Sequence, residues 1–85
     1  MIYSIFYKRS ASDELLKIPA NTAHKVLSAI NSLSETPRPQ NSKKLKGSNN
    51  VYRIRVGNYR VVYTIADSIL IITVIKIGHR KDVYR

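Results

Sequence analysis

Cysteine and tryptophan are absent from this sequence of 85 residues, and glycine and proline each occur only three times. Without cysteine the chain can form neither a disulfide framework nor a thiolate metal site, although small secreted domains often depend on such cross-links. No apolar run reaches the roughly 20 residues that span a bilayer, and no basic segment precedes the first apolar stretch. We therefore expect a cytoplasmic protein with no signal peptide, no membrane contact, no metal and no cofactor.

Acidic residues are also scarce, with five Asp and Glu against fifteen Lys and Arg, and the formal net charge is +10. The excess is unevenly distributed along the chain. Residues 1–36 hold four basic and three acidic side chains, whereas residues 37–85 hold eleven basic and two acidic ones. Such an excess is typical of a protein with a polyanionic partner. We expect the first part to be scaffold and the second part to carry the anion-binding surface.

The length allows a single domain, 1–85, with a thin core, and the apolar fraction of 44% is ordinary for a folded chain. An apolar and aromatic segment over residues 2–8 predicts a strand. Ser10 and Asp13 are spaced like a capping box and predict a short helix that ends before Pro19. Apolar side chains at helical spacing predict a second helix from Pro19 to near Thr36, and they are Ala23, Val26, Leu27, Ile30 and Leu33.

The middle of the chain predicts a loop followed by a hairpin. Residues 37–50 are polar and basic and have the composition of a loop. Residues 51–56 and 59–65 alternate between apolar and polar side chains, as strands do. Gly57-Asn58 between them is typical of a tight two-residue turn that joins two antiparallel strands.

The last predicted strand covers residues 69–77. It is apolar on both faces except at Thr73 and Lys76, which is typical of a central strand. The element order is then β-α-α-β-β-β. We expect an α+β fold in which two N-terminal helices pack on one face of a small, mainly antiparallel four-stranded sheet.

Three arginines are expected to share one face of the hairpin. A two-residue turn at Gly57-Asn58 places Arg55 opposite Arg60 and Arg53 opposite Val62. The alternate side chains point to the other face and can receive the helices, and they are Tyr52, Ile54, Val56, Tyr59, Val61 and Tyr63. Opposed like charges destabilise a sheet by up to ~1 kcal/mol. We therefore expect an anion to complete the site, because guanidinium groups bind phosphate bidentately and keep their charge.

The alternative interpretation of these arginines is a solvated strand face that serves only solubility. Acidic and basic side chains normally mix on such a face. No acidic residue occurs between Glu35 and Asp67, and this absence favours an anion-binding face.

Three stretches of the chain carry a resemblance to a known family. They are Leu45-Lys46-Gly47, the hairpin from Val51 to Tyr63, and the ending Gly78-His79-Arg80-Lys81-Asp82-Val83-Tyr84. Over nearly its whole length the sequence resembles the RelE/ParE superfamily of toxins from toxin-antitoxin systems. The resemblance to the RelE branch implies an endoribonuclease, an mRNA interferase that cleaves mRNA in the ribosomal A site and so inhibits translation. In that reaction a 2′-hydroxyl attacks the adjacent phosphate and leaves a 2′,3′-cyclic phosphate.

The resemblance also implies a role for each matching residue. Arg60 matches a phosphate-clamping arginine, and Arg80 matches an arginine that stabilises the transition state and protonates the leaving group. Tyr84 matches a tyrosine that stacks on the substrate base, although a C-terminal tyrosine can also simply fill the core. We expect further RNA contacts from the remaining basic side chains of the loop and tail, which are Lys43, Lys44, Lys46, Lys81 and Arg85.

The general base of the reaction is left open by the sequence. Arg53 and Arg55 stand where RelE has two lysines, one of them the proposed base, and arginine is a poor proton acceptor. His79, Lys44 or Lys46 is the hypothesised replacement as acid or base. For His79 the alternative is a strand-end residue that points away from Arg80, because successive side chains of a strand alternate.

Two other functions compete with RNA cleavage. One is that of the ParE branch, which resembles RelE in fold but inhibits DNA gyrase without enzymatic activity. The other is simple nucleic-acid binding. For an RNA-cleaving toxin the resemblance implies three partners: a cognate antitoxin, the ribosome with its mRNA, and operator DNA reached only through the antitoxin complex.

Overall fold

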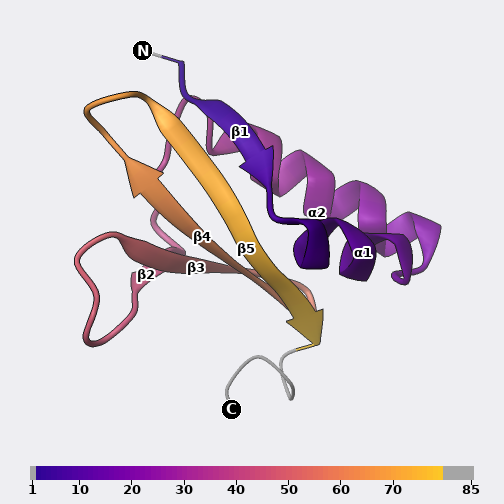
Figure 1. Ribbon diagram of the computed structural model, residues 1–85. Coiled ribbons are helices and arrows are strands. Elements are labelled where there is room, and N and C mark those ends of the chain that lie inside the picture. Colours follow the sequence, from indigo (N-terminus) through magenta and orange to yellow (C-terminus); the bar gives the residue numbers. More distant parts are fainter. Residues whose placement is uncertain (1, 80–85) are drawn as a thin grey trace.

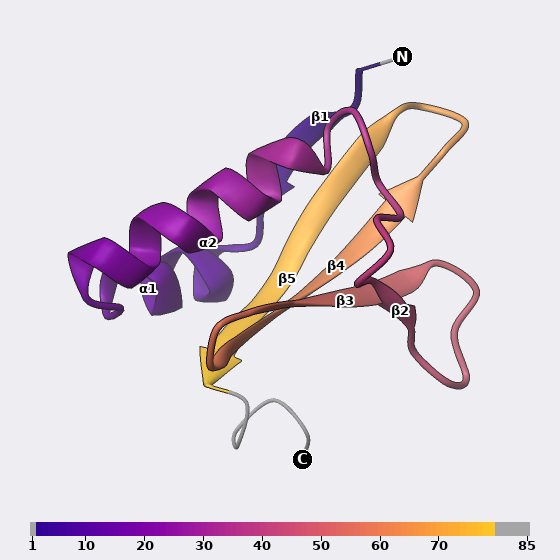
Figure 2. The ribbon, with the colours of Figure 1, turned by 180° about the vertical axis from the view of Figure 1, so that it is seen from behind.

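The computed structural model describes residues 2–79 of the chain (Figure 1). Its elements are β1 (Ser4–Tyr7), α1 (Arg9–Leu16), α2 (Ala20–Ser32), β2 (Lys43–Lys44), β3 (Val51–Val56), β4 (Tyr59–Ala66) and β5 (Ile71–His79). The strands form one sheet in the order β1-β5-β4-β3-β2, in which β1 is parallel to β5 and all other neighbours are antiparallel. Both helices lie on the same side of the sheet (Figures 1 and 2). The predicted α+β architecture is confirmed.

The predicted number of four strands is wrong, because the sheet has five. The additional strand β2 lies inside the segment 37–50 that was expected to be a loop, and it pairs Lys43 with Arg53 and Lys44 with Tyr52. The backbone N–H of Leu45 also donates a hydrogen bond of 2.9 Å to the carbonyl of Val51. A two-residue strand has too few side chains to show alternation, so its pairing depends on the neighbouring strand rather than on composition.

The core lies between the helices and the sheet. From α2 it receives Val26 and Ile30, with Leu33 directly after the helix, as the helical spacing predicted. From α1 it receives Ala11. The sheet contributes the buried side chains Ile54, Val61, Tyr63, Ile65, Ile72, Val74 and Ile77. Burial of this apolar layer holds the sheet against the helices, and within residues 2–79 no helix covers the opposite side of the sheet.

The first helix differs slightly from its prediction. It begins at Arg9, with Lys8 as the residue before it and no side chain bonded to its free N–H groups. The predicted capping box from Ser10 to Asp13 is therefore not formed, because Ser10 lies inside the first turn. The helix ends at Leu16, before Pro19, as predicted. Neither helix within residues 2–79 is long and apolar enough to cross a membrane.

Strand β5 contains a one-residue bulge where it pairs with β4. Tyr63 is opposite Val74, but the next residue back along β4, Val62, is opposite Lys76, so Ile75 has no partner residue of its own. Val74 and Ile77 are both buried in the core although they are three residues apart, which a regular strand with its two-residue repeat cannot achieve. The bulge therefore exchanges the faces of all later residues of β5.

Candidate nucleic-acid interface

The hairpin of β3 and β4 has the predicted register. Arg55 is opposite Arg60, Arg53 is opposite Val62, and the turn is closed by Gly57 with φ of 60°. That positive φ is readily available to glycine and rarely to other residues, so the turn chemistry fixes the register. Arg53, Arg55 and Arg60 consequently share one face of the sheet.

The alternate side chains of the hairpin all pack on or within the core, as predicted, and they are Tyr52, Ile54, Val56, Tyr59, Val61 and Tyr63. Because side chains alternate along a strand, the register puts the arginines on the other face, away from the core. We call this face the cationic face. Strands β2 to β5 contain no acidic residue, so nothing on these four strands offsets its charge.

Burial distinguishes the three arginines. Arg53 is only 8% exposed and Arg60 only 4%, whereas Arg55 is exposed. A buried guanidinium keeps its charge, because arginine is not deprotonated in proteins, and its surroundings restrict its orientation. Arg55 and Arg60 form a directly opposed like-charge pair, which costs a few tenths to ~1 kcal/mol of stability. Burial therefore restricts the orientation of Arg53 and Arg60, whereas Arg55 is exposed on the same face.

The lysines near the hairpin are divided between the two faces. Lys43 pairs with Arg53 and therefore belongs to the cationic face, whereas Lys44 pairs with Tyr52 and faces the other way. Lys46 is exposed in the loop after β2, where no strand pairing fixes its direction. Of the three predicted loop contacts, the register brings only Lys43 to the arginines.

His79 lies on the side of the helices. It pairs with Tyr59, and the two rings meet edge to face with 5.6 Å between their centroids. Both rings line a cavity of about 550 Å³ at the edge of β5, together with Glu14 and Lys17 of α1. The side chain of His79 is therefore not brought to Arg53, Arg55 and Arg60, although it was a candidate acid or base for them.

Lys76 joins the cationic face and was missed in the analysis of the sequence. It pairs with Val62, which in turn pairs with Arg53, so these three residues form a row across three strands. Its side chain is exposed, while Ile77 beside it is 1% exposed. The available signal was the single lysine in an otherwise apolar strand, but without knowledge of the bulge its face could not be assigned.

Four predicted site residues, Arg80, Lys81, Tyr84 and Arg85, lie outside the described residues. Within residues 2–79, no group of three His, Cys, Asp or Glu side chains is arranged to hold a metal ion.

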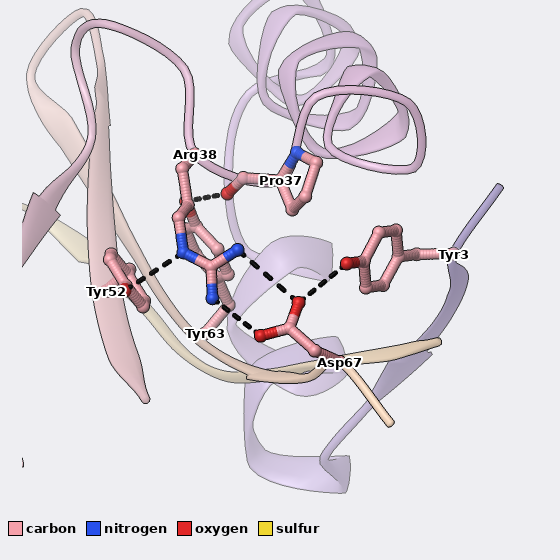
Figure 3. A network of polar contacts seen from close by, with 6 residues as sticks. All are labelled: Tyr3, Pro37, Arg38, Tyr52, Tyr63 and Asp67. Carbon is pink, nitrogen blue, oxygen red and sulfur yellow. Dashed lines mark hydrogen bonds and ion pairs between the residues drawn. The ribbon is translucent and has the colours of Figure 1, made fainter. Parts of the chain in front are cut away.

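A second site, built around one arginine, lies at the other end of the hairpin, where the loop before β2 meets the sheet (Figure 3). Arg38 donates a hydrogen bond of 3.0 Å to the hydroxyl of Tyr52 and forms an ion pair of 2.8 Å with Asp67. Tyr3 donates a hydrogen bond of 2.6 Å to the same carboxylate. These contacts join the loop, the start of β3, the turn after β4 and the segment before β1, and we call them the Arg38 network.

Protonation in this region follows from its contacts. The hydrogen bond from Arg38, with the bond from Tyr3, lowers the pKa of Asp67, and the same bond to Asp67 raises the pKa of Arg38. Burial raises the pKa of Tyr63 to about 12, and its hydroxyl donates a hydrogen bond of 2.8 Å to the carbonyl of Pro37. The Arg38 network therefore anchors the loop that leads into β2, the strand that carries Lys43 on the cationic face. Asp67 was not singled out in the sequence, because its partners are remote along the chain.

Comparison with known proteins identifies the family. Residues 5–84 match the family of ParE toxins of type II toxin-antitoxin systems, parDE. The chain is 31% identical to the protein RelE1 of Methanocaldococcus jannaschii over 88 aligned positions that cover 100% of this chain and 98% of that protein.

Solved structures agree with this assignment. A chain of the archaeal RelE-RelB complex from Pyrococcus horikoshii is similar with a TM-score of 0.85 and 25% identity, over 96% of this chain and 99% of that one. The isolated RelE toxin of Escherichia coli is similar with a TM-score of 0.81 and 27% identity, over 96% and 90% of the two chains.

These observations define a class of protein. Its members are basic α+β domains with two helices on one face of the sheet and arginines on the other. The chain belongs to the RelE/ParE superfamily of toxins of type II toxin-antitoxin systems, and within that superfamily it is RelE-like.

Proposed function

We propose that this toxin is a ribosome-dependent mRNA interferase, an endoribonuclease that cuts mRNA in the ribosomal A site. In the proposed reaction the 2′-hydroxyl of one nucleotide attacks the adjacent phosphate and a 2′,3′-cyclic phosphate is formed. The observation that carries the proposal is the cationic face, in which Arg53, Arg55 and Arg60 stand in register on the side of the sheet opposite the core. The names of its RelE relatives support the same branch of the superfamily.

The cationic face suits the electrostatic part of this chemistry. Negative charge grows on the phosphate oxygens as the fifth bond to phosphorus forms, and fixed positive groups stabilise that charge. Arg53 and Arg60 are held in place by burial, so they need little reorganisation when the phosphate arrives. Loss of one such group typically lowers a rate by about 10²- to 10³-fold.

The C-terminal segment completes the proposal. Arg80 is assigned to the transition state and the leaving group, and Tyr84 to stacking on the substrate base. Lys81 and Arg85 would add phosphate contacts beside them, as would Lys43 on the cationic face and Lys46 in the loop after β2. These assignments rest on the resemblance of Gly78 to Tyr84 to the RelE ending.

A cognate antitoxin is the proposed protein partner. Solved structures similar to this chain include toxins in complex with RelB from Pyrococcus horikoshii and Escherichia coli. The chain also exposes large apolar side chains near β1 and the turn before β5, namely Ile2, Phe6 and Ile69. Such apolar surface on a small domain is typical of an interface. Contact with operator DNA is proposed only through the antitoxin.

The proposal is tested with purified toxin, ribosomes programmed with a defined mRNA, and primer extension to map cut sites. We expect cuts within the A-site codon for the wild type and their loss in Arg80→Ala and Tyr84→Ala. Lys25→Ala is the matched control, because Lys25 is exposed on α2, away from the cationic face, and should leave the cuts unchanged.

Inhibition of DNA gyrase is the second candidate function, because the matching family is named for ParE toxins. It is measured in parallel as loss of supercoiling on a relaxed plasmid. Inhibited supercoiling without any cut mRNA would reject the ribonuclease proposal in favour of the ParE activity. RNA binding without cuts and without gyrase inhibition would leave a simple binding module.

A further inference from the structure

The arginines of the cationic face cannot perform one step of the proposed reaction, which is acceptance of the proton from the 2′-hydroxyl. Attack by a 2′-hydroxyl needs a group that accepts its proton, and a guanidinium does not accept protons near neutral pH. His79 carries its side chain on the other side of the sheet, beside Tyr59. Among the described residues of the cationic face, only lysines have a side chain that can be deprotonated to a nucleophilic or basic amine.

Within residues 2–79, two lysines lie on this face, Lys43 and Lys76, and they differ in how firmly their backbone is held. Lys43 belongs to the two-residue strand β2 at the outer edge of the sheet. Lys76 belongs to the nine-residue strand β5, which pairs with β4 along its length. Groups that take part in chemistry need a rigid support, because small displacements cost large factors in rate. Lys76 is therefore the better placed of the two.

The bulge at Ile75 is what brings Lys76 to this face. With regular pairing from Tyr63 onward, Lys76 would be opposite Val61, and its ammonium group would point into the apolar core. The extra residue places it opposite Val62 instead, and Ile77 fills the core position. Bulges are frequent beside active sites, where they redirect one side chain. The sheet thus departs from regular pairing at the one point that turns this lysine toward the arginines.

The spacing of Lys76 and the arginines fits one phosphate group. Neighbouring strands are about 4.8 Å apart, so Lys76 and Arg53 flank Val62 at about 10 Å from each other, a span that two long side chains can close around one phosphate. Gly78, two residues further along the same face, is opposite Arg60 and has no side chain. Gly78 therefore puts no side chain next to Arg60 or Lys76 on this face.

We infer that Lys76 is the proton acceptor of the proposed ribonuclease reaction, an assignment that rests on the proposed function. The 2′-oxygen of the RNA forms a bond to the adjacent phosphorus, and its proton passes to the neutral amine of Lys76. The bond between phosphorus and the 5′-oxygen of the next nucleotide breaks, and that oxygen is protonated by the leaving-group acid of the proposed function. Lys76 then returns its proton to the solvent, from which that acid regains one, so the protons balance.

Charged groups of both signs lie around Lys76. On the cationic face they are Arg53 and Arg60, on β3 and β4, and Lys43 on β2. At the edge of β5, Lys76 borders the cavity that Glu14, Lys17 and His79 also line, and there Glu14 forms an ion pair of 3.6 Å with Lys17. Cations therefore predominate around Lys76.

Lys76→Arg and Lys76→Gln separate proton transfer from electrostatics. Arginine keeps the positive charge but cannot accept the proton, whereas glutamine loses both. Lys25→Arg and Lys25→Gln on α2 are the matched controls for the same changes at an exposed lysine away from the cationic face. Single-turnover cleavage of ribosome-bound mRNA, affinity for the same RNA and thermal unfolding are measured for all five proteins.

We expect Lys76→Arg to lower the single-turnover rate about 100-fold, the usual size of general-base catalysis, while RNA affinity and melting temperature stay close to the wild type. Lys76→Gln should lose a similar factor in rate and bind more weakly. The wild-type rate should rise with pH above neutrality, and this rise should be absent in Lys76→Arg.

Each outcome bears on a different claim. A Lys76→Arg protein that cuts within about threefold of the wild-type rate overturns the assignment of the proton acceptor and leaves the ribonuclease proposal standing. A wild type that cuts no mRNA on programmed ribosomes overturns the ribonuclease proposal itself, and the role of Lys76 with it.

Discussion

Two arginine sites lie at opposite ends of the β3–β4 hairpin, and they have opposite surroundings. At one end, Arg38 is 42% exposed yet meets a carboxylate, a tyrosine hydroxyl and an aromatic face, all from this chain. At the other end, Arg60 is 4% exposed and stands opposite another arginine on strands without acidic residues. Exposure alone would favour Arg38 as the functional site. The distribution of charge is the better guide, because Arg38 is paired with Asp67, whereas several cations gathered on one face attract an external anion.

The largest effect that distinguishes the two ends is expected at Arg60. Arg60→Gln should lower single-turnover cleavage by about 100-fold or more, because one fixed positive group is removed from the transition state. Arg60→Lys should keep part of the wild-type rate, because lysine supplies the positive charge but not the planar guanidinium group. The measurement is cleavage of ribosome-bound mRNA with thermal unfolding in parallel. A folded Arg60→Gln protein with wild-type rate would contradict the functional role of this end.

At the other end, Arg38→Ala should lower the melting temperature by a few degrees and leave cleavage per folded molecule unchanged within about twofold. The loop before β2 loses its bonds to Tyr52 and Asp67, but no group of the cationic face is removed. Arg38→Lys keeps the positive charge but loses the planar group that contacts both oxygens of Asp67. Its melting temperature should therefore lie between those of the wild type and Arg38→Ala. If Arg38→Ala lost cleavage as Arg60→Gln does, while its melting temperature stayed the same, the contrast between the two ends would be false.

The Arg38 network should also give the protein part of its acid sensitivity. Because the pKa of Asp67 is lowered in the folded chain, the ionised carboxylate contributes stability above its unfolded pKa of about 3.9. That contribution is lost as pH falls from there through the folded pKa. Melting temperatures measured from pH 7 to pH 2 should therefore decline less steeply for Asp67→Asn than for the wild type. Equal declines in melting temperature for the two proteins would show that the ion pair between Arg38 and Asp67 contributes nothing to the stability of the fold.

The smallest expected effect is a gain in stability. Arg55→Gln removes the like-charge pair with Arg60 and should raise the free energy of unfolding by a few tenths to ~1 kcal/mol, measured by urea titration. The same change should weaken RNA binding and reduce the slope of log affinity against log salt by about 0.7 for single-stranded RNA. A variant that gains stability and binds RNA as before would place Arg55 outside the interface.

Much of this fold is determined by local sequence, and those parts were predictable. The hairpin register follows from two turn residues, Gly57-Asn58, because a tight turn fixes every later pair. The helical stripe on α2 follows from spacing alone. The sharing of one face by Arg53, Arg55 and Arg60 could therefore be predicted before any coordinates were available.

The remaining features depend on distant parts of the chain. Strand β2 exists only because β3 pairs with it, and Arg38 lies 29 residues from Asp67 in the sequence. The bulge at Ile75 has no sequence signature, since Ile and Lys are compatible with either face until the pairing of β4 is known. This is why the position of Lys76 was missed, and why His79 could not be assigned to a face.

The bulge also affects how this toxin can change during evolution. Point substitutions in β5 alter one side chain at a time and leave the others where they are. Deletion of Ile75 would convert β5 into a regular strand in which Lys76 is still opposite Val62 and Ile77 is still opposite Val61. We therefore expect natural variants to lose one residue at this point more readily than to gain one, because the loss keeps both faces of the sheet intact.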